Sequence, residues 1–418
     1  MRSETRREGQ ERHRRQERPG ADGSASYHRS AAGANGRELV IGLSSGTSMD
    51  GIDAALVAFG AGEAGGMELL AFRTQEYSQA LRSELARCCR GGGCADVARL
   101  NVAVGEVFAK AALDLLASTG HEPADVSCIG SHGQTLIHLP QAEEIGGMRV
   151  SATLQIGELS VVAERTGITT VGDFRARDMA AGGEGAPLVP ILDHEMLTHP
   201  ERGRVALNLG GIANVTGLPA GGSLADLVAF DTGPANVLLD AAARKHQLEG
   251  GIDEGGALAM TGAPDPELLA ALMTHPFFER RPPKSVDVGL FAGDYAERCW
   301  EAAADLSTSD LLRTLAELTA LTVVDGIERF IAPRQTVDEI VVSGGGTHNA
   351  AVMSALQAHL PAARVLTADE VLSIPGDAKE AFLFAYLGHL ALAGRCGNVP
   401  SATGAERAVV LGKIVPGA

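Results

Sequence analysis

From Glu38 onward, short apolar runs alternate with longer helical stretches, a pattern typical of α/β proteins. Two helices stand out within this pattern. Apolar residues recur every three or four positions over 311–327, which predicts a helix with one stripe packed on a sheet. Residues 377–392 are apolar on nearly every side after Glu380, which predicts a helix between two layers. The runs that predict strands are 39–43, 54–59, 126–130, 168–171, 205–209, 227–230 and 339–342.

Several predicted strands run directly into glycine turns. These turns contain Gly46, Gly210 and Gly211, Gly233, and the run of three glycines that begins at Gly344. A single glycine often does no more than close a turn. Open α/β sheets, however, bind ligands at the carboxyl ends of their strands, so four such turns together predict a nucleotide cleft. The similar strand and glycine turn near Gly46 and near Gly210 suggest two duplicated lobes.

Length and composition agree with a two-domain globular protein that binds a small ligand. The chain has 418 residues, more than one hydrophobic core normally serves. Hydrophobic residues make up 45% and charged residues 21%, as in ordinary globular proteins, while 52 glycines imply many tight turns. The net charge of −17 argues against nucleic acid as the main partner, because nucleic-acid binding needs clustered Lys and Arg.

Residues 1–37 differ from the rest of the chain. They hold nine Arg against four Glu and one Asp, with no apolar stretch, which predicts a disordered tail and no secretion or import signal. The chain has no apolar run long enough for a membrane span, so we expect a cytoplasmic protein without membrane contact. Six cysteines without paired metal-ligand spacing predict reduced thiols.

The first chemical motif is IGLSSGTSMDGIDAALV, residues 41–57. It predicts a strand, a turn through Asp50 and Gly51, and a second strand. Backbone N–H groups and the hydroxyls of this turn are suited to phosphate oxygens, and Asp50 or Asp53 to Mg²⁺. A solvated hairpin without a ligand is the alternative. The sequence contains neither the G-x-x-x-x-G-K-[ST] phosphate loop nor a G-x-G-x-x-G turn after a strand.

Two further motifs place polar groups after strands. In IGSHGQTLIHLP, residues 129–140, His132 and Gln134 are candidates for contact with a polar ligand. In residues 168–190, Asp173 leaves a strand and is followed by Arg175. Such a carboxylate can act as a general base while the arginine positions phosphate or substrate. A salt bridge that only stabilises the turn is the alternative.

The second half of the chain repeats the combination of glycine with Asn or Asp after a strand. Gly210, Gly211 and Asn214 are candidates for phosphate contact, and Asp231 for contact with Mg²⁺ or its waters. The glycines from 344 to 346 are candidates for contact with a base or ribose. Each motif is weak alone and stronger in this order.

Together these segments resemble the anhydro-N-acetylmuramic acid kinase family, within the sugar kinase, Hsp70 and actin superfamily. The similarity rests on SGTSMDGID, GSHGQT, VGDFRARDMAAGGEGAPLVP, LNLGGIANVT, FDTGPANVLLD, DEGG, HPFF, PPKS, SGGGTHN and PGDAKEAFLFA. The resemblance implies an α/β, two-lobed actin-like ATPase (ribonuclease H-like) fold with a nucleotide cleft between the lobes. It further implies a kinase that uses ATP and Mg²⁺ to open the 1,6-anhydro ring of an amino sugar with water and to phosphorylate O6. A homodimer is also plausible from the resemblance.

The resemblance also implies a division of the chain and roles for single residues. We expect an N-terminal lobe from 38–172 plus 376–418, with a returning C-terminal helix, and a C-terminal lobe from 173–375. Asp173 is then the base that activates water, and Glu380 contacts substrate or metal, or else only provides a charge at a helix start. The expected nucleotide residues are Gly46, Thr47, Ser48, Met49, Asp50, Gly51, Ile52, Asp53, Gly210, Gly211, Asn214, Gly344, Gly345 and Gly346.

One segment departs from the family pattern. After PPKS come Val286, Asp287 and Val288, where a more polar continuation is expected. We interpret this as variation on the substrate side, which bears on sugar specificity. Two rival hypotheses therefore stay open, a kinase of the same fold for another carbohydrate and a catalytically silent ATP-binding module.

Overall fold

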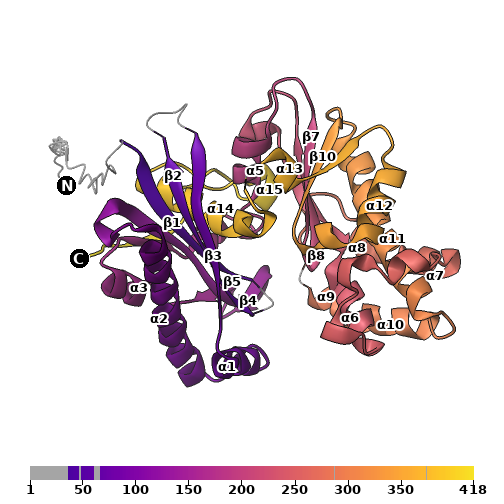
Figure 1. The fold of residues 1–418 in the computed structure, drawn as a ribbon, viewed down its shortest axis with the longest axis horizontal. Helices are drawn as coiled ribbons and strands as arrows, with labels where there is room; N and C mark the ends of the chain where they lie inside the picture. Colours follow the sequence, from indigo (N-terminus) through magenta and orange to yellow (C-terminus); the bar gives the residue numbers. More distant parts are fainter. Residues whose placement is uncertain (1–35, 47–48, 61–65, 287, 373) are drawn as a thin grey trace, which may run out of the picture.

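The computed structural model describes residues 36–46, 49–60, 66–286, 288–372 and 374–418, which form two α/β lobes side by side (Figure 1). The N-terminal lobe contains a seven-stranded sheet in the order β12-β6-β4-β1-β2-β3, with β5 paired to β4. Strands β1, β2 and β3 are antiparallel neighbours, whereas β4 and β6 run parallel to β1. The strands are β1 (Glu38–Ser45), β2 (Gly51–Phe59), β3 (Met67–Glu76), β4 (Val126–Ile145), β5 (Met148–Ile156), β6 (Thr170–Gly172) and β12 (Lys413–Val415).

The C-terminal lobe contains a five-stranded sheet in the order β11-β10-β7-β8-β9. Strands β7, β8 and β9 are antiparallel neighbours, and β10 and β11 run parallel to β7. Strand for strand this is the order of β6-β4-β1-β2-β3, so the expected duplication of the lobes is confirmed in the topology. The strands are β7 (Arg204–Leu209), β8 (Ile212–Leu218), β9 (Val228–Pro234), β10 (Glu339–Ser343) and β11 (Arg364–Thr367).

Three hydrophobic cores hold the helices on the two sheets. In the N-terminal lobe, α2 covers one face of the sheet, and α14 packs on β1 and β4 from the other side (Figure 1). The core around α14 also includes Ala206, Leu218 and Val341 of the second sheet, so the two lobes share one apolar interior. The longer helices are α1 (Gln79–Cys89), α2 (Cys94–Thr119), α3 (Leu159–Thr166), α5 (Pro190–Leu197), α6 (Asn236–Lys245), α10 (Asp294–Ala302), α11 (Thr308–Gly326), α12 (Ala350–His359) and α14 (Lys379–Leu392). The shorter ones are α4 (Phe174–Ala180), α7 (Pro266–Leu272), α8 (Pro276–Glu279), α9 (Gly289–Ala292), α13 (Ala368–Val371) and α15 (Pro400–Thr403).

Two glycines allow α14 to lie directly on the sheet. A Cβ added at Gly42 of β1 would lie 1.8 Å from the carbonyl oxygen of Ala381, and one at Gly130 of β4 would lie 1.9 Å from that of Phe384. No side chain fits in that space, so glycine is required at both positions. The close approach places the first turn of α14 directly against β1 at Gly42.

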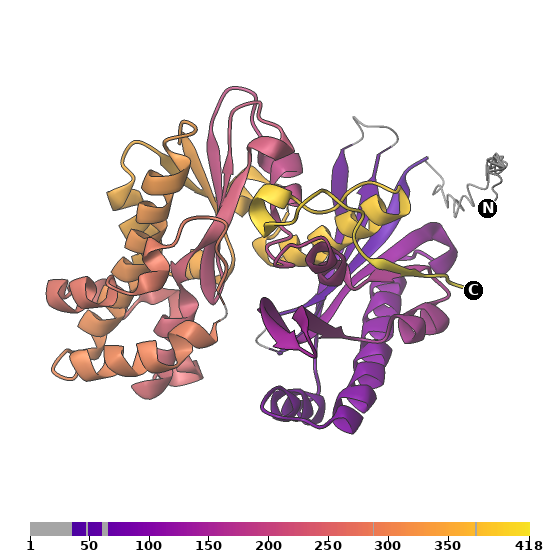
Figure 2. The same ribbon diagram turned by 180° about the vertical axis from the view of Figure 1, so that it is seen from behind.

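The chain finally returns to the N-terminal lobe. After α15, strand β12 adds to the sheet edge antiparallel to β6, and the C-terminus lies on the N-terminal lobe (Figure 2). Lys413 pairs with Gly172, the last residue of β6. This return brings residue 413 next to Asp173, which is 240 positions away in the chain.

All seven predicted strands and both predicted helices are confirmed. β4 is longer than predicted and continues as a hairpin with β5, and β3, β5, β8, β11 and β12 were not anticipated. The division at 172/173 and 375/376 stays a prediction, and almost the whole tail of residues 1–37 lies outside the described residues. In the described part of the chain, no helix is both long and apolar enough to cross a membrane.

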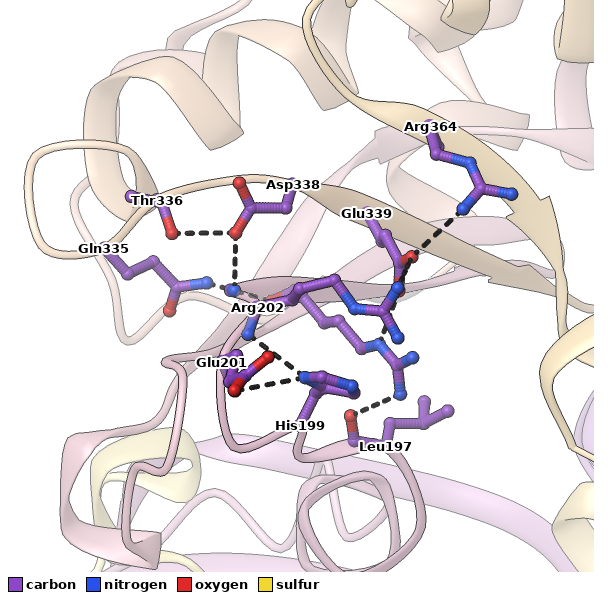
Figure 3. Close-up of polar contacts among 11 residues, drawn as sticks. Leu197, His199, Glu201, Arg202, Gln335, Thr336, Asp338, Glu339 and Arg364 are labelled. Carbon is purple, nitrogen blue, oxygen red and sulfur yellow. Dashed lines mark hydrogen bonds and ion pairs between the residues drawn. The ribbon is translucent and has the colours of Figure 1, made fainter.

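A buried ion-pair cluster fixes the start of the C-terminal-lobe strands (Figure 3). Glu339, the first residue of β10, is only 2% exposed and lies between three guanidinium groups. Its carboxylate is 2.8 Å from Arg204 Nε, 2.9 Å from Arg202 Nη1 and 3.5 Å from Arg364 Nη1. This cluster lies where β7, β10 and β11 begin, whereas the glycine turns follow the C-terminal ends of β7 and β10. Its role is therefore structural.

Candidate active site

A pocket of about 290 Å³ opens beside Asp173 in the N-terminal lobe. Its walls come from the first half of β4, the end of β5, the start of α3 and the returning strand β12. The lining is Asn101, Ser131, His132, Gly133, Leu154, Gln155, Ile156, Gly157, Glu158, Leu159, Asp173, Lys413 and Val415. The mixture of carboxylates, amides, a hydroxyl and a few aliphatic side chains suits a polar molecule of sugar size.

Asp173 connects β6 to α4 in a left-handed backbone conformation, with φ 55° and ψ 39°. Within the described chain its carboxylate makes no capping hydrogen bond to α4. Instead, Oδ2 accepts a hydrogen bond of 2.7 Å from Lys413 Nζ. The side chain is therefore available to a ligand in the pocket, and the alternative of an Asp173–Arg175 salt bridge is wrong, because the ion partner is Lys413.

Arg175 contacts His132 and so connects α4 with the first half of β4. Arg175 Nε donates to His132 Nε2 over 3.0 Å, and Nη1 donates to the carbonyl of Gly185 over 2.9 Å. His132 stacks on Phe384 with a centroid distance of 4.5 Å. Burial and the nearby guanidinium hold the pKa of His132 well below its usual value, so the imidazole is neutral and accepts through Nε2.

The loop that follows α4 is held by Asp178, which is completely buried. Its carboxylate accepts hydrogen bonds from Gly185 N (2.8 Å), Asn398 Nδ2 (2.7 Å) and Thr403 Oγ1 (2.8 Å). These partners come from the loop itself and from the C-terminal segment. Asp178 therefore anchors the loop whose Gly185 carbonyl accepts from Arg175, and it does not line the pocket.

Gln134 holds the turn between β1 and β2. It is fully buried, with Oε1 2.7 Å from Ser45 Oγ and Nε2 donating to the carbonyl of Gly46 over 3.1 Å. The Ser45 hydroxyl also lies 2.7 Å from the carbonyl oxygen of Gly51. The structure thus places Gln134 behind the predicted phosphate turn, where it orients the turn, and does not place it in the pocket wall.

The turn between β1 and β2 gathers negative charge. Thr47 and Ser48 lie outside the described residues, and Met49, Gly51 and Ile52 follow on the described side with Met49 at φ 54°. Asp53 accepts a 2.6 Å hydrogen bond from Thr74 Oγ1.

Partial burial raises the pKa of Asp53, helped by the negative charges of Asp377 and Asp50, although the bond from Thr74 opposes the shift. A local excess of carboxylates is a favourable environment for a cation.

Glu380 belongs to the same cluster. It lies in the first turn of α14 and its side chain is exposed. Desolvation raises the pKa of Glu380, the positive charge of Arg175 opposes this, and Asp53 adds to it. The structure therefore brings together Glu380, Asp53, Arg175 and His132, which are far apart in the sequence.

The glycine turns of the C-terminal lobe also meet. Gly344 has φ 86°, and a Cβ there would lie 2.7 Å from Asn208 Oδ1 at the end of β7, while one at Gly346 would lie 2.6 Å from Leu209 Cβ. The carbonyls of Gly210 and Gly211 accept hydrogen bonds from the first residues of α6. Gly345 lies with Gly344 and Gly346 after β10, and Asn214 pairs with Asn208 across β7 and β8. These turns thus form one surface of backbone groups where β7 and β10 end.

The two clusters are joined through Lys379, which precedes Glu380. Its Nζ lies 3.5 Å from Ser343 Oγ, and Ser343 precedes the first of the three glycines. Nζ is also 2.7 Å from Asp193 Oδ1. Residues next to Glu380 and next to Gly344 are therefore in direct contact, across the junction of the lobes.

Asp231 has a different environment from Asp50 and Asp53. Its Oδ2 accepts a 2.8 Å hydrogen bond from the backbone of Val286. Burial raises the pKa of Asp231 to about 7, opposed by the Val286 hydrogen bond and by Lys284, while the charge of Glu184 adds to the rise. The Glu184 carboxylate itself accepts from Ser285 Oγ. Asp231 thus organises the segment that contains PPKS.

The described residues contain no group of three or more His, Cys, Asp or Glu side chains arranged to hold a metal ion. Mg²⁺ in phosphoryl-transfer sites, however, usually takes only one or two carboxylates and completes its shell with phosphates and water. The two neighbouring carboxylates of Asp50 and Asp53 fit that requirement. Asp231 fits it less well, because one of its oxygens is committed to Val286.

Sequence reasoning missed the pocket residues Asn101, Glu158 and Lys413. Asn101 Oδ1 accepts from Gly157 N over 2.8 Å and Nδ2 donates to Glu158 over 3.0 Å, so these residues shape the pocket floor. Asn101 lies inside a long helix and Lys413 in a three-residue strand. Neither position shows a glycine turn or a paired-carboxylate spacing, and we find no sequence signal that marks them.

The segment that departs from the family pattern lies in the C-terminal lobe. Val286 and Val288 pack against the C-terminal-lobe core and do not line the pocket around Asp173, while Asp287 lies outside the described residues. A Cβ at Gly211 would lie 3.5 Å from Val288 Cγ2. The two valines adjoin the glycine turn of the second lobe, and the interpretation as substrate-side variation stays a prediction.

Two lobes with the same strand order, each with a glycine turn after its first strand, define the two-lobed actin-like ATPase fold, the class that includes the sugar kinases, Hsp70 and actin. A family model described as anhydro-N-acetylmuramic acid kinase matches residues 38–417. The chain belongs to this family of kinases, and the resemblance seen in the sequence is confirmed.

Curated relatives agree with this assignment. An anhydro-N-acetylmuramic acid kinase of Caldanaerobacter subterraneus subsp. tengcongensis is 42% identical over 382 residues, which is 90% of this chain and 96% of the relative. One of Gloeobacter violaceus is 43% identical over 381 residues, 90% of this chain and 98% of the relative. Among solved structures, a ROK family glucokinase from Streptomyces griseus in complex with glucose and AMPPNP matches 84% of this chain and 98% of its own, with 16% identity and a TM-score of 0.37.

Proposed function

We propose that this chain is an ATP-dependent kinase that converts anhydro-N-acetylmuramic acid, water and ATP into N-acetylmuramic acid 6-phosphate and ADP. The observation that carries the proposal is the carboxylate of Asp173, which lines a polar pocket of about 290 Å³ and has the exposed Lys413 as its ion partner. Membership of the kinase family, with relatives of that name at about 42% identity, supports the substrate.

In the proposed reaction Asp173 takes a proton from water while the water oxygen bonds to the anomeric carbon. The bond between that carbon and O6 of the 1,6-anhydro bridge breaks, and the electron pair stays on O6. O6 then attacks the γ-phosphorus of ATP, and ADP leaves. His132 and Glu380 would orient the sugar, and Arg175 holds the neutral imidazole of His132 through Nε.

The nucleotide would lie between the β1–β2 turn and the glycine turns at Gly210 and Gly344. Backbone N–H groups in such turns are suited to phosphate oxygens. Asp50 and Asp53 would hold Mg²⁺, which supplies charge neutralisation to the phosphates when it is bound. Asp231 remains a weaker candidate ligand for the same ion.

The proposal is tested by ADP release with Mg·ATP and anhydro-N-acetylmuramic acid, with product mass recorded in ¹⁸O-labelled water. We expect a product heavier than the sugar by one water and one phosphoryl group, with solvent oxygen at the anomeric carbon. The Asp173→Asn variant should form no such product and incorporate no solvent oxygen. Because asparagine tolerates the left-handed backbone of this position, the variant should still fold.

A kinase for another carbohydrate would incorporate no solvent oxygen, and an ATP-binding module without catalysis would release no sugar-dependent ADP. Either result would refute the proposed reaction. An Asp173→Asn variant with wild-type turnover would refute only the assignment of Asp173 as the base, and the proposed reaction would stand.

A further inference from the structure

Lys413 is the one residue with a positive charge among the described residues that line the pocket. The other ionised groups there are the carboxylates of Asp173 and Glu158, and His132 is neutral because its pKa is held well below its usual value. The pocket therefore carries two negative charges and one positive charge at neutral pH. A ligand with its own carboxylate would be repelled by this wall unless it met the ammonium group.

The two carboxylates do not compete equally for Lys413. Glu158 accepts hydrogen bonds from Ser160 N over 3.1 Å and from Asn101 Nδ2 over 3.0 Å. The Lys413 ammonium lies instead 2.7 Å from Asp173 Oδ2. Glu158 is thus satisfied by its own neighbours, while Lys413 has three donors and uses one of them on Asp173.

The backbone position of Lys413 is fixed, whereas its side chain is free to reorient. Pairing of β12 with β6 sets Lys413 opposite Gly172. Its side chain is 68% exposed, so the ammonium can contact Asp173 and a bound ligand from the same backbone position.

We propose that Lys413 is a specificity-determining residue that binds the lactyl carboxylate of the muramic sugar and so selects acidic over neutral amino sugars. The inference rests on the proposed function, because it concerns the same pocket and the same class of substrate. A muramic sugar differs from a glucosamine sugar by this ether-linked carboxylate. An ammonium–carboxylate hydrogen bond is among the stronger polar contacts, and it would also relieve the repulsion from Asp173 and Glu158.

The test compares two ligands of nearly equal shape, anhydro-N-acetylmuramic acid and its methyl ester, in which the carboxylate is masked. Calorimetric affinities are measured for the full-length wild type, Lys413→Met and Lys413→Arg, without ATP so that no turnover occurs. We expect the wild type to prefer the acid by about 10-fold, the range of one charge-assisted hydrogen bond. Lys413→Met should bind both ligands alike, and Lys413→Arg should keep most of the preference.

A matched control is Lys110→Met, which removes an exposed lysine that pairs with Asp114 on α2. It should leave the preference unchanged. Equal binding of acid and ester by the wild type, or an unchanged preference in Lys413→Met, would overturn the inference while the proposed function stands. Wild type that binds neither ligand and turns over no sugar would overturn the proposed function, and the inference with it.

Discussion

Carboxylates near the junction of the lobes differ in how many hydrogen bonds and ion pairs they make within the protein. Asp178 uses its oxygens on three donors, and Asp193 faces Lys379 and accepts from Thr216 Oγ1 over 3.1 Å. Asp173 has one exposed lysine as its partner. A general base needs an oxygen that can accept a proton, so these partners separate a catalytic candidate from structural groups better than exposure does.

Asp231 gives a pH-dependent prediction. Burial raises its pKa to about 7 in the folded protein, against about 3.9 for an unfolded chain. Between these values the folded state binds more protons than the unfolded state, so this group makes stability fall as pH rises from about 4 to about 7. Asp231→Asn removes the effect and can still accept from Val286. Its melting temperature relative to wild type should rise across that window, by about 2 °C or more.

Thermal unfolding from pH 4.5 to 8 without ligands measures this difference. Asp226→Asn is the control whose melting difference should stay constant over this range, because hydrogen bonds from Ser223 lower the pKa of Asp226 and place its titration below pH 4.5. Asp226 contributes stability when it is ionised, and this is lost as pH falls through its lowered pKa. A melting difference for Asp231→Asn that is the same at every pH would contradict the assignment.

Among the elements, the sequence identified those with a strong pattern. Buried strands β1, β7 and β10 are short apolar runs bounded by turns, and α11 has an apolar stripe, so each was predictable. β3 was missed because most of its residues are at least partly exposed, so its pattern is weak.

Among the candidate site residues too, those with a strong local sequence pattern could be predicted. Asp173, His132 and Glu380 could be predicted because each adjoins a glycine turn or a helix start. Lys413 could not, because it enters the pocket through a three-residue strand whose pairing with β6 is decided by long-range packing. Pairing between segments 240 residues apart leaves no trace in local periodicity.

The contact of α14 with the sheet gives the second prediction. Gly42→Ala places a methyl group 1.8 Å from the carbonyl oxygen of Ala381, where backbone has to move. Overpacking of this kind costs about 3 kcal/mol or more. We expect a large fall in the urea midpoint of unfolding, and loss of sugar-dependent ADP release because the first turn of α14 carries Glu380.

Gly66→Ala is the matched control, since a Cβ there meets nothing within 4 Å and its φ is not positive. It should change the urea midpoint little. A Gly42→Ala variant with the stability and turnover of wild type would show that α14 does not need this close approach.

At the scale of the whole molecule, the lobes are joined by a core that both sheets share. α14 and α5 lie in that core, together with residues of β7, β8 and β10. The buried pair of Lys379 and Asp193 bridges these two helices, with side-chain exposures of 11% and 3%. The junction between the lobes is therefore packed by apolar side chains and bridged by a buried ion pair.

The ion pair gives the third prediction. Lys379→Met leaves the Asp193 carboxylate buried without its cation, which costs about 3 to 5 kcal/mol when one partner of a buried pair is removed. The double variant Lys379→Met with Asp193→Leu has no uncompensated charge, so it should be more stable than Lys379→Met alone. Because the lobes share a core, each protein should unfold in one cooperative transition, followed by urea unfolding and calorimetry. Additive losses in the double variant, or separate transitions for the two lobes in wild type, would show that the pair and the shared core do not couple the lobes.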